Sequence, residues 1–125
     1  MPTTEISRSF RIEAAHRLPN LPADHKCARL HGHSFEITLV VRGELDAKLG
    51  WILDFATIDQ AFAPVFAEID HRYLNEVPGL ENPTSEILAR WVFDRVKLPA
   101  GRLARVTVAE NCTSRCTVYA DGEAG

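Results

Sequence analysis

The chain has 125 residues, a length that favours one domain with a modest hydrophobic core. It is 46% hydrophobic and 25% charged, and its net charge of −3 argues against nucleic acid or an anionic membrane surface as its partner. No apolar run approaches the roughly 18 residues of a membrane span. Three cysteines, an odd number behind an N-terminus without an apolar signal segment, favour a reducing compartment. We therefore expect a single cytoplasmic domain over residues 1–125.

Residues 5–16 and 31–43 alternate apolar and polar side chains with the period of two that is typical of half-buried strands. The residues between them, 17–30, are rich in turn-forming residues and are predicted to form a loop. Pairing the two strands as an antiparallel hairpin brings the end of the first beside the start of the second. The apolar faces of the two strands carry Ile6, Phe10, Ile12, Ala14 and His16, and then His31, His33, Phe35, Ile37, Leu39 and Val41.

Two helices are predicted in the middle of the chain. Asp54 can N-cap a helix over residues 55–69, in which Pro64 predicts a kink or an early break. A loop is expected over residues 70–82, after which Pro83 is predicted to occupy the first position of a second helix.

Residues 102–110 and 114–120 alternate again and predict two further strands. The element order is therefore β-β-α-α-β-β, without repeats or a linker. The most economical arrangement is an α+β fold with one four-stranded antiparallel sheet and two helices on one face.

His16, His31 and His33 are the strongest candidates for a metal site. Each lies on the apolar face of its predicted strand, and the hairpin brings the three together. Three neutral imidazoles can bind Zn²⁺ and leave a fourth position open, which is typical of catalytic sites, whereas closed structural sites use four protein ligands. The alternative, three ordinary histidines near a sheet edge, is less consistent with this spacing.

Cys27 stands four residues before His31, in a loop that also contains His25, Lys26 and Arg29. Nearby cations or a metal favour a reactive thiolate. From residue types alone, a fourth zinc ligand and a catalytic nucleophile or base remain open for this thiol, beside a purely structural role.

Three other polar residues are candidates for proton transfer or binding. Asp70 could orient His71 as a proton-transfer group if the backbone turns there; otherwise the pair is a solvated helix end. Glu110, at the end of the third long strand, is either an exposed strand end or a carboxylate that binds a ligand with paired N–H donors. We interpret Cys112 and Cys116 as structural.

Six separated motifs agree in order with one known family: EAAHRLP, CARLHGHSF, WILDF, IDHRYLN, PGLENPTSE and VAENC. Together they cover nearly the whole chain, which resembles the 6-pyruvoyltetrahydropterin synthase family. The short Cys-x-x-x-His-Gly-His spacing is similar to the bacterial 6-carboxy-5,6,7,8-tetrahydropterin synthases of queuosine biosynthesis. The pyruvoyl-forming branch usually has a longer gap at this point.

The resemblance implies a T-fold, in which trimers close their sheets into a barrel, trimers stack into hexamers and active sites lie between subunits. Residue by residue, it implies zinc on His16, His31 and His33, and makes Cys27 the general base. It further implies Asp70 and His71 as proton-relay partners, and Glu110 as the anchor for the amino-pyrimidine edge of a pterin.

The implied reaction converts 7,8-dihydroneopterin triphosphate to 6-carboxy-5,6,7,8-tetrahydropterin, acetaldehyde and triphosphate. For the triphosphate we nominate Lys26 and Arg29, the cations of the loop before His31, with Arg17 behind them. Two alternatives remain: a synthase that stops at the pyruvoyl product, and a zinc-stabilised pterin-binding module without turnover.

Overall fold

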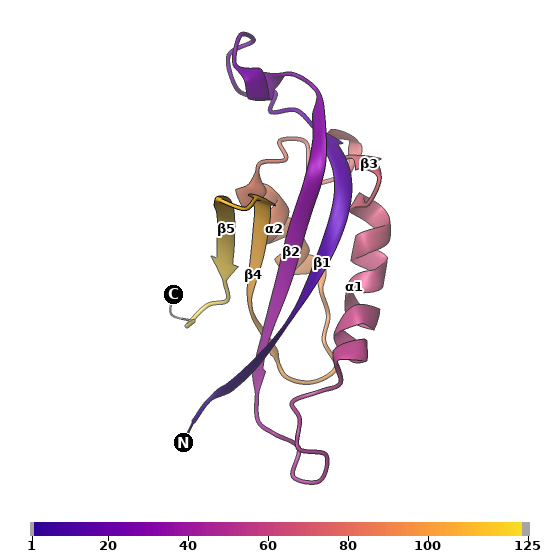
Figure 1. The fold of residues 1–125 in the computed structure, drawn as a ribbon, viewed down its shortest axis with the longest axis vertical. Coiled ribbons are helices and arrows are strands. Elements are labelled where there is room, and N and C mark those ends of the chain that lie inside the picture. The colour runs from indigo at the N-terminus through magenta and orange to yellow at the C-terminus, as the bar shows by residue number, and fades with distance from the viewer. Residues whose placement is uncertain (1, 124–125) are drawn as a thin grey trace.

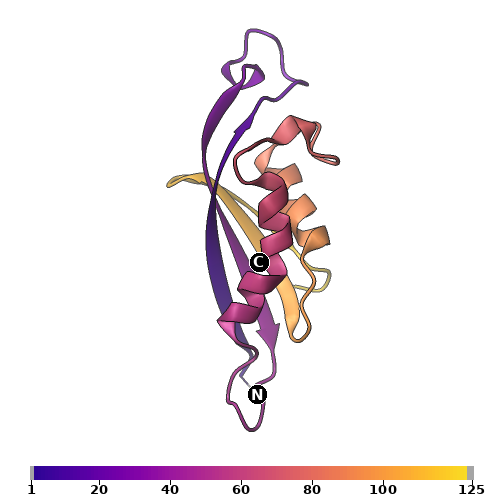
Figure 2. The same cartoon turned by 90° about the vertical axis from the view of Figure 1, so that its right-hand side faces the viewer.

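Two long strands, β1 (Thr4–His16) and β2 (His31–Gly43), form the centre of the fold, and both helices pack on the same face of their sheet (Figures 1 and 2). The computed structural model describes residues 2–123. The remaining elements are η1 (Lys26–Ala28), α1 (Phe55–Ile69), β3 (Arg72–Tyr73), η2 (Leu74–Glu76), α2 (Ser85–Arg95), β4 (Arg102–Asn111) and β5 (Ser114–Tyr119).

The sheet has the order β3-β1-β2-β4-β5 and confirms the predicted α+β class. The prediction of four strands is wrong by one, because β3 lies within the segment expected to be a loop. It adds to the sheet through two residues only, Arg72 beside Ala14 and Tyr73 beside Ala15, and it runs parallel to β1. So short a strand has no alternating pattern of its own, so the sequence gives no signal for it.

Helix α1 begins as predicted, with the Asp54 carboxylate accepting a hydrogen bond from the Ala56 N–H at 3.0 Å. The early break predicted at Pro64 does not occur, since the helix continues to Ile69. Pro64 is exposed, whereas Val65 and Ile69 beyond it are buried in the core. Burial of this apolar face offsets the one hydrogen bond that proline cannot make.

Helix α2 begins two residues later than predicted. Thr84 is its N-cap, and its hydroxyl accepts a hydrogen bond from the Ile87 N–H at 3.1 Å. Pro83 therefore precedes the cap and is not the first helical residue. A threonine at this position satisfies a free N–H group at the helix start, which proline cannot do.

The two faces of the sheet differ sharply in character. The face toward the helices is apolar, with Ile12, Phe35 and Ile37 fully buried. The opposite face is covered by neither helix (Figure 2) and carries polar pairs such as Ser9 and Thr38, whose hydroxyls are 2.8 Å apart. In the part of the chain that the structure describes, neither helix is long and apolar enough to cross a membrane.

The hairpin of β1 and β2 has the predicted pairing. His16 lies opposite His31, and Ala14 lies opposite His33. The connecting segment, residues 17–30, extends past the end of the sheet, at the top of Figure 1, and carries η1. This register determines which side chains meet at that end of the sheet.

Candidate active site

His16, His31 and His33 come together at the end of the β1–β2 hairpin, as predicted. One ring nitrogen from each can be chosen so that the three atoms lie within 4.8 Å of one another. Within residues 2–123, this is the only group of three or more histidine, cysteine, aspartate or glutamate ligand atoms that meets this limit. Cys27 is not a member of it.

Backbone carbonyls orient all three imidazole rings. The Nδ1 atoms of His16, His31 and His33 lie 2.9, 2.8 and 2.9 Å from carbonyl oxygens. A carbonyl oxygen can only accept, so each Nδ1 carries the proton and each Nε2 presents a lone pair. The accepting carbonyls belong to Pro83, Arg29 and Ser34.

Two of these lone pairs face each other. The Nε2 atoms of His16 and His33 are 3.3 Å apart, and neither has a proton to donate to the other. Two imidazole ligands of a tetrahedral Zn²⁺, at about 2.05 Å each, have nitrogens about 3.3 Å apart. The spacing of His16 and His33 therefore fits two ligands of a zinc ion, and the three imidazoles form a donor set that zinc accepts.

Burial favours the neutral form of the central ligand. His16 is 1% exposed, and this burial lowers its pKa, while the hydrogen bond to the Pro83 carbonyl acts in the opposite direction. A neutral imidazole is the form that binds metals. His16 is therefore preorganised as a ligand at neutral pH.

Glu110 lies on β4 near this cluster, and its negative charge also acts on the pKa of His16. Its Oε1 accepts a hydrogen bond from the Ser85 hydroxyl at 2.6 Å, which fixes the carboxylate against the start of α2. The strand is irregular between Ala109 and Asn111, so Glu110 departs from the regular pairing. An irregularity of this kind is a common means of aiming a side chain at a site.

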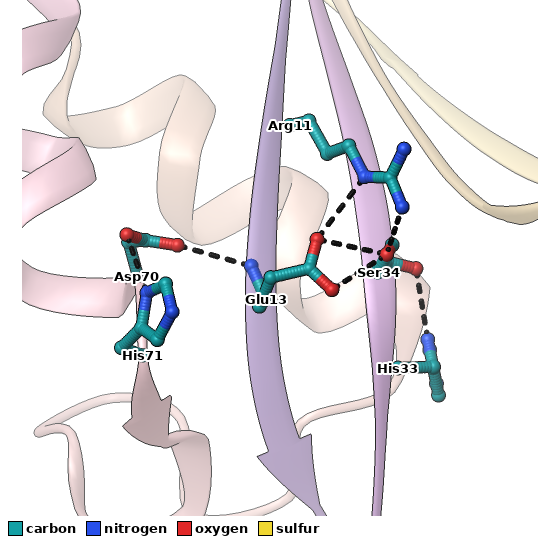
Figure 3. A network of polar contacts seen from close by, with 6 residues as sticks. All are labelled: Arg11, Glu13, His33, Ser34, Asp70 and His71. Carbon is teal, nitrogen blue, oxygen red and sulfur yellow. Dashed lines mark hydrogen bonds and ion pairs between the residues drawn. The ribbon is translucent and has the colours of Figure 1, made fainter.

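Asp70 and His71 form the pair that the sequence suggested, and the backbone does turn between them. His71 has a φ of 57°, in the left-handed region, and its Nδ1 lies 2.8 Å from Asp70 Oδ2. The other Asp70 oxygen accepts the Glu13 N–H at 3.0 Å (Figure 3). Burial raises the pKa of Asp70, but the hydrogen bonds from Glu13 and His71 outweigh it and leave the pKa below its usual value.

His71 and His33 line one shallow surface hollow, together with Glu13, Gly32 and Tyr73. Of the three clustered histidines only His33 lines this hollow, so the hollow joins the Asp70–His71 pair to one member of the cluster.

Cys27, Lys26 and Arg29 lie in the extended loop. Cys27 is half-buried and is a free thiol, and its N–H donates to His25 Nδ1 at 3.0 Å. Lys26 and Arg29 have exposed side chains. Arg29 contacts the histidine cluster through its backbone carbonyl.

Sequence reasoning missed the groups that orient the site. The Pro83 carbonyl, the Ser85 hydroxyl and the Glu13 backbone reach it from 67, 25 and 57 residues along the chain from their partners. Two of them are backbone groups, which leave no trace in residue type. Ser85 had no signal beyond its place at the start of a helix.

Comparison with known proteins places this arrangement in a family. Residues 5–121 match the family model of 6-pyruvoyl tetrahydropterin synthase. The chain is 38% identical to a 6-carboxy-5,6,7,8-tetrahydropterin synthase of Synechocystis, with 91% of this chain and 92% of the relative covered. It is 29% identical to the human 6-pyruvoyl tetrahydrobiopterin synthase, with 85% and 84% covered.

Among solved structures, 6-pyruvoyl tetrahydropterin synthase of Caenorhabditis elegans superposes with a TM-score of 0.86 and 27% identity, covering 97% of this chain and 98% of that one. The T-fold expected from the sequence is thereby confirmed, and the relatives support a pterin synthase type of activity. This chain belongs to the 6-pyruvoyl tetrahydropterin synthase family.

Proposed function

We propose that the protein is a zinc-dependent 6-carboxy-5,6,7,8-tetrahydropterin synthase, which converts 7,8-dihydroneopterin triphosphate and one water to the carboxypterin, acetaldehyde and triphosphate. The observation that carries the proposal is the pair of unprotonated Nε2 atoms of His16 and His33 at 3.3 Å, since a cation between them resolves their repulsion. The Synechocystis relative, similar over nine-tenths of the chain, supports the choice of product.

His16, His31 and His33 would hold the metal through Nε2. When bound there, zinc supplies Lewis-acid polarisation of substrate oxygens. The three backbone carbonyls keep the rings oriented before the metal arrives, so little conformational freedom is lost on binding.

Glu110 would bind the amino-pyrimidine edge of the pterin, which presents paired N–H donors. Within the described residues its Oε2 accepts no hydrogen bond, while Oε1 is held by Ser85. An ionised carboxylate with one fixed oxygen can accept two parallel N–H groups, as it does from an arginine. This contact would set the position of the side chain that reacts.

Proton transfer is assigned to Cys27 on one side and to the Asp70–His71 pair on the other. The Asp70 carboxylate holds the His71 Nδ1–H, which leaves Nε2 to act as an acceptor or, when protonated, a donor beside the hollow that His71 lines with His33. Cys27 would act as the general base, since it lies outside the ligand group. Lys26 and Arg29 are proposed to bind the triphosphate.

The active form is proposed to be an oligomer, a hexamer of two stacked trimers, with its sites between subunits. In the described chain Asp70, His71 and β3 occupy the outer edge of β1 from Glu13 to Ala15, so this edge is open from Thr4 to Ile12, as is the outer edge of β5. Two open edges on one sheet allow neighbouring copies to continue it into a ring. The extended loop with Cys27 could then reach a neighbouring copy.

The proposed location is the cytoplasm, since a reducing compartment fits the three free thiols of the chain.

A product assay tests the reaction. Zinc-loaded protein is incubated with 7,8-dihydroneopterin triphosphate, and the products are identified by mass spectrometry with a hydrazine trap for acetaldehyde. We expect carboxytetrahydropterin and one equivalent of trapped acetaldehyde. Pyruvoyltetrahydropterin without acetaldehyde would assign the chain to the other branch of its family, and zinc binding without turnover would leave a pterin-binding module.

A further inference from the structure

Glu13 on β1 and Ser34 on β2 form a polar pair on the sheet face that the helices leave open. They lie opposite each other in the register, and the Ser34 hydroxyl is 2.7 and 2.8 Å from the two carboxylate oxygens of Glu13 (Figure 3). Arg11 donates to both, to Glu13 Oε2 at 3.1 Å and to Ser34 Oγ at 2.8 Å. The Ser34 hydroxyl thus accepts from Arg11 and donates to Glu13.

The backbone of Glu13 forms hydrogen bonds with both members of the Asp70–His71 pair. Its N–H donates to Asp70 Oδ1 at 3.0 Å, and its carbonyl accepts the His71 N–H at 2.6 Å. In an antiparallel ladder the N–H and C=O of one residue point to the same side. Because both groups of Glu13 point toward β3, Glu13 and Ser34 form a pair without main-chain hydrogen bonds between them.

The backbone of Ser34 contacts the histidine cluster. Its carbonyl accepts the His33 Nδ1–H at 2.9 Å and so aims that ring at the metal position. Glu13 and Ser34 are opposite each other in the register, so at this one position β1 contacts Asp70 and His71 while β2 contacts the ring of His33. The direct tie between Glu13 and Ser34 is made by their side chains.

We propose that Glu13 and Ser34 are positioning residues that hold His33 and the Asp70–His71 pair in a fixed relation across the seam between β1 and β2. The inference rests on the proposed function for its chemistry, but the link itself is a property of the fold. Hydrogen bonds from Ser34, and then from Arg11, lower the pKa of Glu13, so the carboxylate is ionised and the tie is charge-assisted.

Hydrogen exchange with zinc as the only ligand tests the link without turnover. If His33 and His71 are connected through this pair, binding of zinc restricts Ser34 and Glu13 and slows exchange of the His71 amide, which donates to Glu13. We expect this slowing in the wild type and in Ser34→Thr, which keeps the hydroxyl. It should be lost in Ser34→Ala and in Glu13→Ala.

Glu36→Ala is the matched control, since Glu36 is an exposed carboxylate in β2, two residues from Ser34 on the same face. It should leave the zinc effect as in the wild type. A zinc effect at His71 that persists in Ser34→Ala would overturn the proposal.

Kinetics provide the second measurement. Ser34→Ala keeps the carbonyl that orients His33 and removes only the tie to Glu13, so we expect kcat to fall by about 10-fold, the lower end of the effect of losing an outer contact of a metal site, with KM and zinc content unchanged. The double variant Glu13→Ala/Ser34→Ala should lose no more than either single variant, because the two act as one unit. Losses that multiply would contradict the link. A wild type that binds zinc but does not turn over the pterin would refute the proposed reaction alone, and the exchange experiment would still decide on the link.

Discussion

The Nε2 atoms of His16 and His33 face each other at 3.3 Å, and neither bears a proton because each ring donates from Nδ1 to a backbone carbonyl. Two lone pairs so placed repel each other unless a cation lies between them. The sheet imposes this arrangement through the hairpin register, which sets His16 opposite His31 and next to His33. The pairing of β1 with β2 therefore builds the group of three histidines that could hold a metal.

Replacing one of these ligands should abolish tight zinc binding. We expect His33→Ala to weaken zinc affinity by more than about 100-fold, the upper end of what loss of an outer contact costs. Competition with a chromophoric chelator measures the affinity. His25→Ala is the control, since His25 lies in the extended loop outside the ligand group, and it should bind zinc as the wild type does. Equal affinities in the two variants would refute the assignment.

The role proposed for Cys27 separates catalysis from metal binding. We expect Cys27→Ala to lower kcat by about 10²- to 10⁴-fold, the range typical of a lost general base, while zinc content stays at that of the wild type. Cys112→Ala, which removes an exposed thiol at the β4–β5 turn, should retain full activity. A Cys27 variant that loses its zinc together with its activity would make this thiol a ligand.

Glu110 should contribute to substrate binding. In Glu110→Gln an amide replaces one acceptor oxygen with a donor, so paired N–H groups of the pterin lose a charged partner. We expect KM to rise by about 10- to 100-fold, the effect of a hydrogen bond to a charged group. Glu36→Gln makes the same chemical change on the open face of the sheet and should leave KM unaltered.

Asp70 gives a pH-dependent contribution to stability. Its folded pKa lies below the unfolded value of about 3.9, so its ionised form stabilises the fold above that value, and the contribution is lost as the pH falls through the folded pKa. We expect Asp70→Asn to lower the free energy of unfolding by about 1 kcal/mol at pH 7. The difference from wild type should shrink below about pH 4 in urea titrations. A difference that is the same at pH 7 and pH 3 would count against this origin.

Pro64 is a residue at which stability can be gained. It is exposed in the middle of α1, and its ring nitrogen cannot donate to the carbonyl four residues earlier. We expect Pro64→Ala to raise the free energy of unfolding by about 1–3 kcal/mol and the Tm accordingly. Calorimetry measures this change, and Ala63→Gly, at the adjacent exposed position, should lower the Tm.

The strands and helices that the sequence predicted correctly are those with a strong local signal. The alternation in β1 and β2 and the carboxylate cap of Asp54 are properties of contiguous residues. Hairpin pairing was sufficient to bring the three histidines together. Strand β3 and the uninterrupted α1 depend on packing between distant segments, which no local pattern records.

The same division holds for the site. Residue types and strand spacing singled out the three histidines that come together, but the carbonyls of Pro83 and Ser34 that orient two of them are backbone groups at positions set by the whole fold. The sequence could not predict whether the backbone turns at His71, because a histidine in the left-handed region is uncommon. Tertiary contacts with the Glu13 backbone hold it there.

The central claim is that zinc is bound by three imidazoles and not by the thiol of Cys27. X-ray absorption at the zinc edge of the loaded protein tests it most directly, because Zn–N and Zn–S distances differ by about 0.2–0.3 Å. We predict a first shell of nitrogen and oxygen at about 2.0–2.1 Å, with three imidazole scattering patterns and no sulfur. A sulfur contribution near about 2.3 Å that disappears in Cys27→Ala would contradict this account and make Cys27 the fourth ligand.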